Sequence, residues 1–349
     1  FLTIEPGWGS EPGNGWNWLE QIAQRVIRVT AVVTPYAAAR LRDDARLPAN
    51  VQLESPTAIP PVSSRLPVPS YYKGYASAHV ALGNVLRELR ADISHQVTLA
   101  TPYWGTDLGE APGIRVLGPV GVSRPAPLWA ARHLGPADVG LEWARRALTR
   151  YPRPPVSADA AITAADHVLA VDTSTARRAK ALGKPVTMFL ADGAHPAQPD
   201  ALVGVKLRHN LVWVGRMMPR KGCELAVEAF ARALPRLPSD ERLILIGDGP
   251  ERGNVERAVK RNGLEHRIEM TGVIPHDDVV GAIGHARALV FSSLRDAFGG
   301  VALEAAERAT PTVWASHRGV DGLRTWLPHE AGWSRPVSSG GQFVEALAG

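Results

Sequence analysis

Short apolar runs alternate with amphipathic stretches along most of the chain, and this alternation predicts the fold. The apolar runs at residues 28–33, 211–214, 243–246 and 288–291 have the length and composition of buried strands. The stretches between them have helical spacing; in residues 223–234, apolar side chains recur at i, i+3, i+4 and i+7. Strands and helices that alternate in this way form parallel, doubly wound sheets with right-handed crossovers.

Both halves of the chain show this pattern, which indicates two domains. A length of 349 residues is enough for two domains of ordinary size. Residues 192–199 are rich in Pro and polar side chains, so we expect the linker there or just after it. We therefore predict an α/β protein with two Rossmann-like domains that face a cleft. Residues 1–200 form the first domain and residues 201–349 the second.

Composition narrows the class of ligand. The chain has 39 basic and 34 acidic residues, a net charge of +5, and no Lys/Arg run or nucleic-acid motif. A pI of about 9.5 then favours a small anionic ligand over a nucleic acid. A single cysteine excludes an internal disulfide, and no apolar stretch reaches the roughly 18 residues of a membrane span. We expect a cytoplasmic protein, although the first residue is Phe1, which leaves the native N-terminus and any removed targeting segment open.

The stretch from residue 288 to residue 308 carries the strongest chemical signal. An apolar strand is followed by a turn with Gly299 and Gly300, after which a helix begins. Glycines that open a helix after a strand predict an anion site, because the first N–H groups of the helix are unpaired and a phosphate can approach closely. Asp296 and Glu304 bracket the turn. Carboxylates in this position suit the hydroxyl groups of a sugar rather than the phosphate.

A second loop, residues 215–222, places two cations after a buried strand. Arg216 can hold two phosphate oxygens at once, whereas Lys221 acts as a point charge. Fixed cations stabilise a departing diphosphate more than the bound ground state, because negative charge grows on it as it leaves. The sequence Gly-Asp-Gly-Pro at residues 247–250 follows the next strand.

Together these motifs resemble the donor site of family-4 retaining glycosyltransferases of the GT-B fold. That family shows two Glu residues separated by seven positions, with Phe-Gly just after the first. Here Asp296, Phe298, Gly299 and Glu304 stand at the matching positions. The chain departs from the family in the shorter Asp296 and in Ala309-Thr310, where Gly usually precedes Pro311.

The resemblance implies roles for individual residues. Arg216 and Lys221 would hold the diphosphate, Glu304 the ribose and Asp296 the transferred sugar, and we treat these four as the catalytic candidates. The other donor-binding candidates act mainly through their backbones: Gly215, Gly247, Val273, Ile274, Pro275, Phe298, Gly299, Gly300 and Val301.

The first half carries weaker motifs of the same kind. Residues 9–18 resemble the first loop of a subgroup of that family, which implies that the N–H groups of Gly13, Asn14 and Gly15 face the donor diphosphate. The sequence Gly-Pro-Val-Gly at residues 118–121 also matches the subgroup, but Gly121 stands where many relatives have a His. His95, on a predicted strand, is a further candidate for contacts with the acceptor or sugar, and the alternative is a structural histidine.

We therefore expect a retaining glycosyltransferase that needs neither a metal nor an organic cofactor. Its partners would be a UDP-, GDP- or dTDP-sugar and a small-molecule or saccharide acceptor. The Ala/Arg/Pro-rich composition indicates a GC-rich bacterial genome, which favours antibiotic or other natural-product biosynthesis, with saccharide assembly as a rival. Two alternatives stay open, a nucleotide-sugar epimerase and a non-catalytic nucleotide-sugar-binding protein. The donor, the acceptor and the oligomeric state are not legible in the sequence.

Overall fold

A computed structural model describes residues 10–57, 59, 68–98, 101, 108–121, 125–150, 158–189, 209–296, 299–320, 322–327 and 332–349. The chain divides into two compact units. The first contains residues 1–122 and 147–194, and the second contains residues 123–146 and 195–349. None of the described helices is both long and apolar enough to cross a bilayer.

The second unit is built on one parallel sheet with a reversal in its strand order. Six strands lie in the order β12-β11-β10-β7-β8-β9. The chain runs outward from β7 to β8 and β9, and then starts again on the other side of β7 with β10, β11 and β12. The loops after β7 and β10 therefore leave the same edge on either side of the switch point, where ligands bind in doubly wound sheets. The strands are β7 (Leu211–Val214), β8 (Leu243–Ile246), β9 (Ile268–Gly272), β10 (Ala288–Phe291), β11 (Thr312–Ser316) and β12 (Gly332–Pro336).

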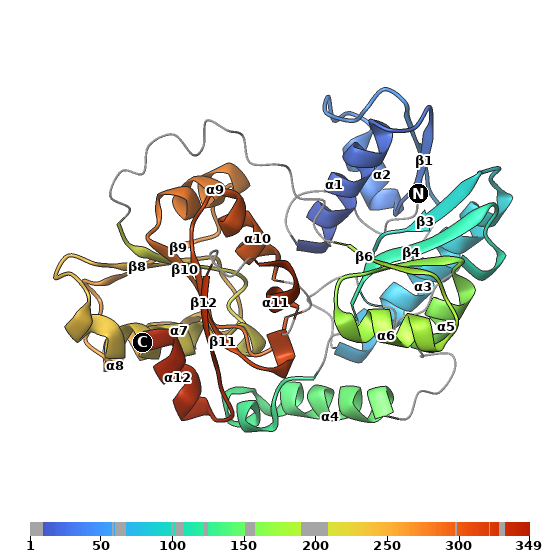
Figure 1. Ribbon diagram of the computed structural model, residues 1–349. Coiled ribbons are helices and arrows are strands. Elements are labelled where there is room, and N and C mark those ends of the chain that lie inside the picture. Colours follow the sequence, from blue (N-terminus) through green and yellow to red (C-terminus); the bar gives the residue numbers. More distant parts are fainter. Residues whose placement is uncertain are drawn as a thin grey trace. The chain divides into compact units, whose positions relative to one another are not determined.

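Helices cover both faces of this sheet. In Figure 1, α7, α8 and α12 lie together on one face, and α9 and α10 lie on the other. The α7 face buries Val227 and Phe230 against Leu243 and Leu245 of β8, as the helical spacing predicts. The helices are α7 (Cys223–Ala233), α8 (Arg252–Arg261), α9 (His276–His285), α10 (Gly300–Glu307), the short α11 (Leu323–Trp326) and α12 (Gly340–Ala348).

Residues 123–146 also belong to the second unit, which differs from the predicted domain boundary. A 3-10 turn at Leu128–His133 and most of α4 (Pro136–Arg150) make up this segment. Its buried side chains, Ala126, Ala130 and Leu134, share a hydrophobic cluster with α7 and α12. The segment packs on the apolar surface of α7 and α12. The local pattern of the sequence does not show with which domain the segment packs. The predicted linker at 192–199 lies outside the described residues.

The first unit has the same layered design. The strands β3 to β6 form a parallel sheet in chain order, and β1 pairs in parallel with β2. Val32 of β1 faces a cluster with α3, α5 and α6, whereas Ala31 and Val33 face a cluster with α1 and α2. The elements are α1 (Ser10–Ala23), β1 (Val29–Val32), α2 (Pro35–Leu41), β2 (Val51–Glu54), α3 (Val68–Glu88), β3 (Ile93–Gln96), β4 (Ile114–Val120), α5 (Ala158–Ala164), β5 (His167–Ala170), α6 (Thr173–Ala181) and β6 (Val186–Met188).

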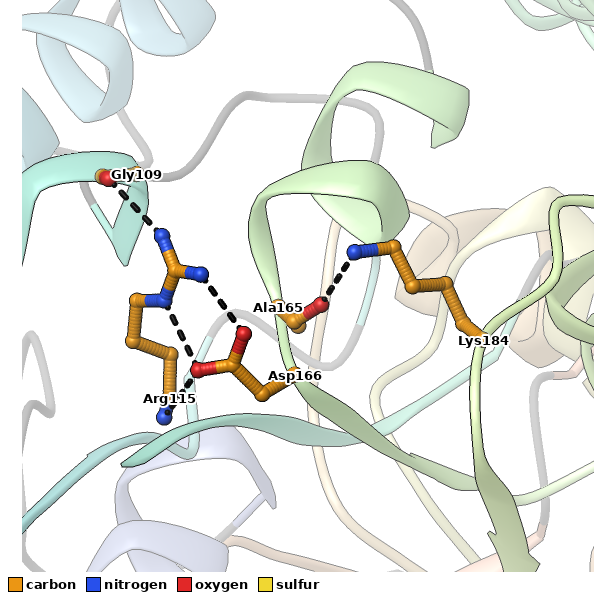
Figure 2. Close-up of polar contacts among 5 residues, drawn as sticks. All are labelled: Gly109, Arg115, Ala165, Asp166 and Lys184. Atoms are coloured by element: carbon orange, nitrogen blue, oxygen red, sulfur yellow. Dashed lines mark hydrogen bonds and ion pairs between the residues drawn. The ribbon is translucent and has the colours of Figure 1, made fainter. Parts of the chain in front are cut away.

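An ion-pair network fastens the amino ends of two strands in this unit (Figure 2). The Arg115 guanidinium donates to both carboxylate oxygens of Asp166, at 2.9 and 2.6 Å, and to the carbonyl of Gly109 at 2.9 Å. The Arg115 backbone N–H also donates to Asp166, and these bonds hold the pKa of that carboxyl well below its ordinary value. Ligands of such sheets bind at the carboxyl ends of the strands. Because Arg115 stands at the start of β4 and Asp166 just before β5, at the amino ends of both strands, we interpret this network as structural.

Candidate functional site

The loops after β7 and β10 are bonded to each other. The indole N–H of Trp213 donates to the Ser292 hydroxyl at 2.9 Å, and that hydroxyl donates to the carbonyl of Lys221 at 3.0 Å. The Leu294 N–H donates to the carbonyl of Arg220 at 2.8 Å. These bonds bring together two loops that are far apart in the sequence, since Ser292 and Lys221 are separated by 71 positions.

Gly222 allows this close approach. Its backbone is left-handed, with φ 63° and ψ 34°, where it precedes α7. A Cβ atom here would stand 2.3 Å from the carbonyl oxygen of Ser292. Both the backbone conformation and the space therefore require glycine.

We expect Gly222→Ala to lower the free energy of unfolding by roughly 1–3 kcal/mol, from the strained backbone alone, and by more once the clash is included. The measurement is urea denaturation. Gly281→Ala in α9 is the matched control, because no atom lies within 4 Å of its Cβ position. That variant should be neutral or slightly stabilising, since glycine weakens a helix. Equal stability of the two variants would contradict the packing described here.

Lys221 and Asp296 meet across the two loops. The Lys221 ammonium donates to Oδ2 of Asp296, and the two side chains are 21% and 14% exposed. The Asp296 N–H donates to the carbonyl of Gly319 at 2.8 Å, which restrains the backbone at Asp296. Burial alone would raise the pKa of Asp296, but the charges of Lys221, Arg220 and Arg295, with the Lys221 hydrogen bond, lower it to about 2. The candidate site therefore holds an ionised carboxylate among several cations.

The low pKa of Asp296 predicts how stability depends on pH. Because its folded pKa of about 2 lies below the ordinary value of 3.8, the ionised group stabilises the fold above pH 3.8, and this contribution is lost as the pH falls toward 2. The full contribution is about 2 kcal/mol. We expect the stability advantage of the native chain over Asp296→Asn to shrink by this order between pH 5 and pH 2 in denaturant titrations. An advantage that stays constant over this range would contradict the coupling.

The glycine pair opens α10 as the sequence predicts. Gly299 stands before the helix with φ 69° and ψ 53°, and among the described residues no side chain caps the helix start. A Cβ atom at Gly299 would stand 2.7 Å from Leu323 Cδ2. Gly300 and Val301 lie in the first turn of α10, where backbone N–H groups have no acceptor within the helix and carry partial positive charge. Phe298 lies outside the described residues.

Glu304 lies on the next turn of α10 and is partly buried. Burial raises the pKa of its carboxyl above the ordinary 4.5, and the nearby charge of Arg308 opposes this only in part. Glu304 and Asp296 thus differ in environment, since Asp296 is surrounded by cations and Glu304 lies on an apolar helix.

The loops after β8 and β9 complete the same edge of the sheet. Gly247 donates its N–H to the carbonyl of Gly272 at 2.8 Å, and a Cβ at Gly247 would stand only 2.0 Å from the carbonyl of Gly215. Val273 is 80% exposed, unlike most large apolar side chains of this unit. Ile274 is partly buried, Pro275 precedes α9, and Arg216 is exposed at the end of β7.

The candidate residues of the first unit lie in other surroundings than the sequence predicts or have a structural role. Gly13, Asn14 and Gly15 were predicted in a glycine-rich turn, and this was wrong, because α1 begins at Ser10 and contains all three. His95 is buried, with Nε2 2.6 Å from the carbonyl of Gly118 and an edge-on contact to Trp18. Burial lowers its pKa to about 4, which fits the structural alternative. Gly121 is buried just after β4.

Arg295 and Glu142 belong to this site but were not predicted from the sequence. Arg295 precedes Asp296, and its guanidinium lies 2.8 Å from the carboxylate of Glu142 on α4. The only signal in the sequence was the adjacency of Arg295 to Asp296. Glu142 gave no signal, because it is more than 150 positions away.

The match to a known protein family falls on the second unit. Residues 208–348 match the family model Glycosyl transferases group 1. The matched range begins just before β7 and ends in α12, so it contains Lys221, Asp296 and Glu304.

Two relatives come from Streptomyces kanamyceticus. Its 2-deoxystreptamine glucosyltransferase is 35% identical over 101 residues, which are 29% of this chain and 26% of that protein. Its alpha-D-kanosaminyltransferase is 32% identical over 120 residues, which are 34% of this chain and 31% of that protein. The aligned residues span about a quarter to a third of these relatives.

A solved structure extends the likeness to the whole fold. Anabaena HepE in complex with UDP and glucose has a TM-score of 0.60 at 15% identity, and the match covers 100% of this chain and 88% of that chain. This likeness and the parallel sheets of each unit confirm the predicted GT-B class with two Rossmann-like domains.

Proposed function

We propose that this protein is a glycosyltransferase that moves a sugar from a nucleoside-diphosphate sugar to an acceptor hydroxyl. The observation that carries the proposal is the Lys221–Asp296 pair at the switch point of the second sheet, beside the uncapped start of α10. This arrangement offers cationic groups and free N–H groups to a diphosphate, and a carboxylate to sugar hydroxyls. The family match over residues 208–348 supports the same reading.

The proposed chemistry assigns charge stabilisation to the second unit. The bond between the anomeric carbon and the β-phosphate oxygen breaks, and a bond from the acceptor oxygen to that carbon forms. Lys221, Arg216 and the N–H groups of Gly300 and Val301 stabilise the diphosphate as its charge grows. The acceptor proton passes to an oxygen of the departing phosphate. We propose that the anomeric configuration is retained and that no metal is needed, since these cations take that role.

The other proposed contacts are those to the ribose, the transferred sugar and the base. Glu304 accepts hydrogen bonds from the ribose hydroxyls, and Asp296 accepts from the transferred sugar. Gly215 and Gly247 let the donor approach the backbone, and Val273, Ile274 and Pro275 lie against the base.

We propose UDP as the first nucleotide to test and an aminocyclitol as the first acceptor. HepE is described in complex with UDP and glucose, and one relative is named as acting on 2-deoxystreptamine. These likenesses support a place in bacterial natural-product biosynthesis. A binding protein without turnover is the second candidate, because Asp296 is engaged by Lys221 in this structure.

The test incubates the full chain with UDP-, GDP- and dTDP-glucose, labelled in the sugar, with and without 2-deoxystreptamine. Release of nucleoside diphosphate together with labelled product supports the proposal, and proton NMR of the product gives the anomeric configuration. Epimerised sugar would replace the proposal by the epimerase reading. Binding of donor without product across an acceptor panel would favour the binding protein.

A further inference from the structure

The loop that carries Asp296 is held by residues 123–146 as well as by Lys221. We call residues 123–146 the strap, because the chain leaves the first unit at residue 123 and returns to it after residue 146. Two separate contacts join the strap to the loop of residues 292–296, and both involve buried side chains.

The first contact is an ion pair. Oε1 of Glu142 lies 2.8 Å from Nε of Arg295, and the side chains are only 10% and 13% exposed. Oε2 of Glu142 accepts a hydrogen bond from the N–H of Ala126 at 2.8 Å. Arg146 donates to the carbonyl of the same Ala126. The two oxygens of Glu142 are therefore both engaged, one within the strap and one on the loop.

The second contact passes through His317. The Trp129 ring of the strap meets the His317 ring edge-on, with centroids 5.7 Å apart. Nδ1 of His317 accepts from the Gly319 N–H at 3.1 Å, so the neutral ring carries its proton on Nε2, 3.2 Å from the carbonyl of Ser293. The Gly319 carbonyl in turn accepts from the Asp296 N–H.

These contacts restrain the loop at residues 293–295, just before Asp296. Leu294 is fully buried in the cluster that contains Ala126, Ala130 and Leu134 of the strap. Arg295 is then drawn to Glu142, while Asp296 is drawn to Lys221. Because Arg295 and Asp296 are adjacent in the chain, a restraint on the Arg295 side chain also limits how far the backbone that carries Asp296 can move.

We propose that Glu142 is a positioning residue for the transfer reaction, which orients Asp296 and Lys221 through its buried ion pair with Arg295. This inference rests on the proposed function. Glu142 itself touches neither donor nor acceptor in this proposal. A buried pair of this kind adds little net stability, because desolvation offsets the attraction, which makes orientation the role that the geometry favours.

The test compares Glu142→Gln, Arg295→Met and the double variant in the full chain, with Glu345→Gln as control. Glu345 pairs with Arg232 at the exposed surface of the same unit, at 62% and 51% exposure. The readouts are kcat and KM for the donor, the dissociation constant of UDP by calorimetry, and the melting temperature.

We expect each single variant to lower kcat about tenfold, with KM for the donor changed less than threefold. The double variant should be no slower than either single variant, because both remove the same restraint. Glu345→Gln should match the native chain. If Glu142→Gln does not fold, Arg295→Met carries the test, since it leaves Glu142 bonded to Ala126.

Two results would overturn the inference. The first is native kcat in a folded Glu142→Gln or Arg295→Met variant, and the second is additive losses in the double variant, which indicate independent structural damage. A native chain that neither binds UDP, GDP or dTDP nor turns over any donor would remove the proposed function itself. Failure of the proposed function can be told from failure of the Glu142 inference, because it is seen in the native chain before any variant is made.

Discussion

Replacing Lys221 by Ala should reduce kcat for sugar transfer by about 10²–10³, the range found when one group that stabilises a developing anion is removed. The loss should fall on kcat more than on KM, because the attraction grows as the diphosphate departs. The variant also leaves Asp296, only 14% exposed, without its closest cation. We therefore expect some loss of stability, measured in the same samples by thermal unfolding.

Two further variants separate charge from folding in this result. Lys260→Ala removes an exposed lysine at the end of α8, and we expect native activity. Lys221→Arg keeps the cation in a different shape and should recover only part of the rate, because the planar group does not reproduce the Lys221 geometry. A folded Lys221→Ala variant within about twofold of native kcat would exclude the proposed site, because the loss of kcat expected on removing a charge-stabilising group is far larger.

Replacing Glu304 by Ala should weaken donor binding by about tenfold to hundredfold, the equivalent of about 1.5–3 kcal/mol for hydrogen bonds to a charged group. The proposed contact is specific to the ribose. The native chain should therefore bind UDP more tightly than 2′,3′-dideoxy-UDP, whereas Glu304→Ala should bind the two alike. Glu265→Ala, in an exposed turn, is the control. A variant that still prefers UDP by the native ratio would place the ribose elsewhere.

The raised pKa of Glu304 adds a pH dependence to this prediction. A carboxyl with a pKa above 4.5 gains its proton at a higher pH than an exposed one, and the protonated form is a poorer acceptor for ribose hydroxyls. We expect UDP affinity to fall as the pH is lowered through the raised pKa, and to depend less on pH in Glu304→Gln. Calorimetric titrations from pH 7.5 to pH 5 measure this difference.

The second unit could be predicted from the sequence in most of its elements. The strands β7, β8 and β10 are short apolar runs, β7 and β8 are each followed by a glycine, and α7 has clear helical periodicity, so local pattern and final structure agree there. The predicted turn at Gly299 and Gly300 and the helix after it are confirmed. The last strand, β12, was not predicted, because residues 332–336 alternate partly exposed and exposed side chains at the sheet edge.

The first unit was less legible for physical reasons. Gly13 and Gly15 suggested a turn, but packing of Trp16, Trp18 and Leu19 overrides their weak helix propensity and extends α1 over them. The sequence predicts Thr173 or Ser174 as the N-cap of α6, whereas the helix begins at Thr173 and Asp172 is the N-cap, since its side chain accepts a hydrogen bond from the Thr175 N–H. Contacts such as Glu142–Arg295 depend on tertiary packing, which no periodicity in the sequence records.

The path of residues 123–146 has a practical consequence for anyone who shortens or recombines this chain. A fragment that starts near residue 195, or at the edge of the family match at residue 208, would lack the segment that covers Leu225, Ala229 and Phe343. Such a fragment would expose apolar surface and tend to aggregate. Chimaeras that exchange donor specificity should therefore take residues 123–146 from the same parent as the C-terminal half.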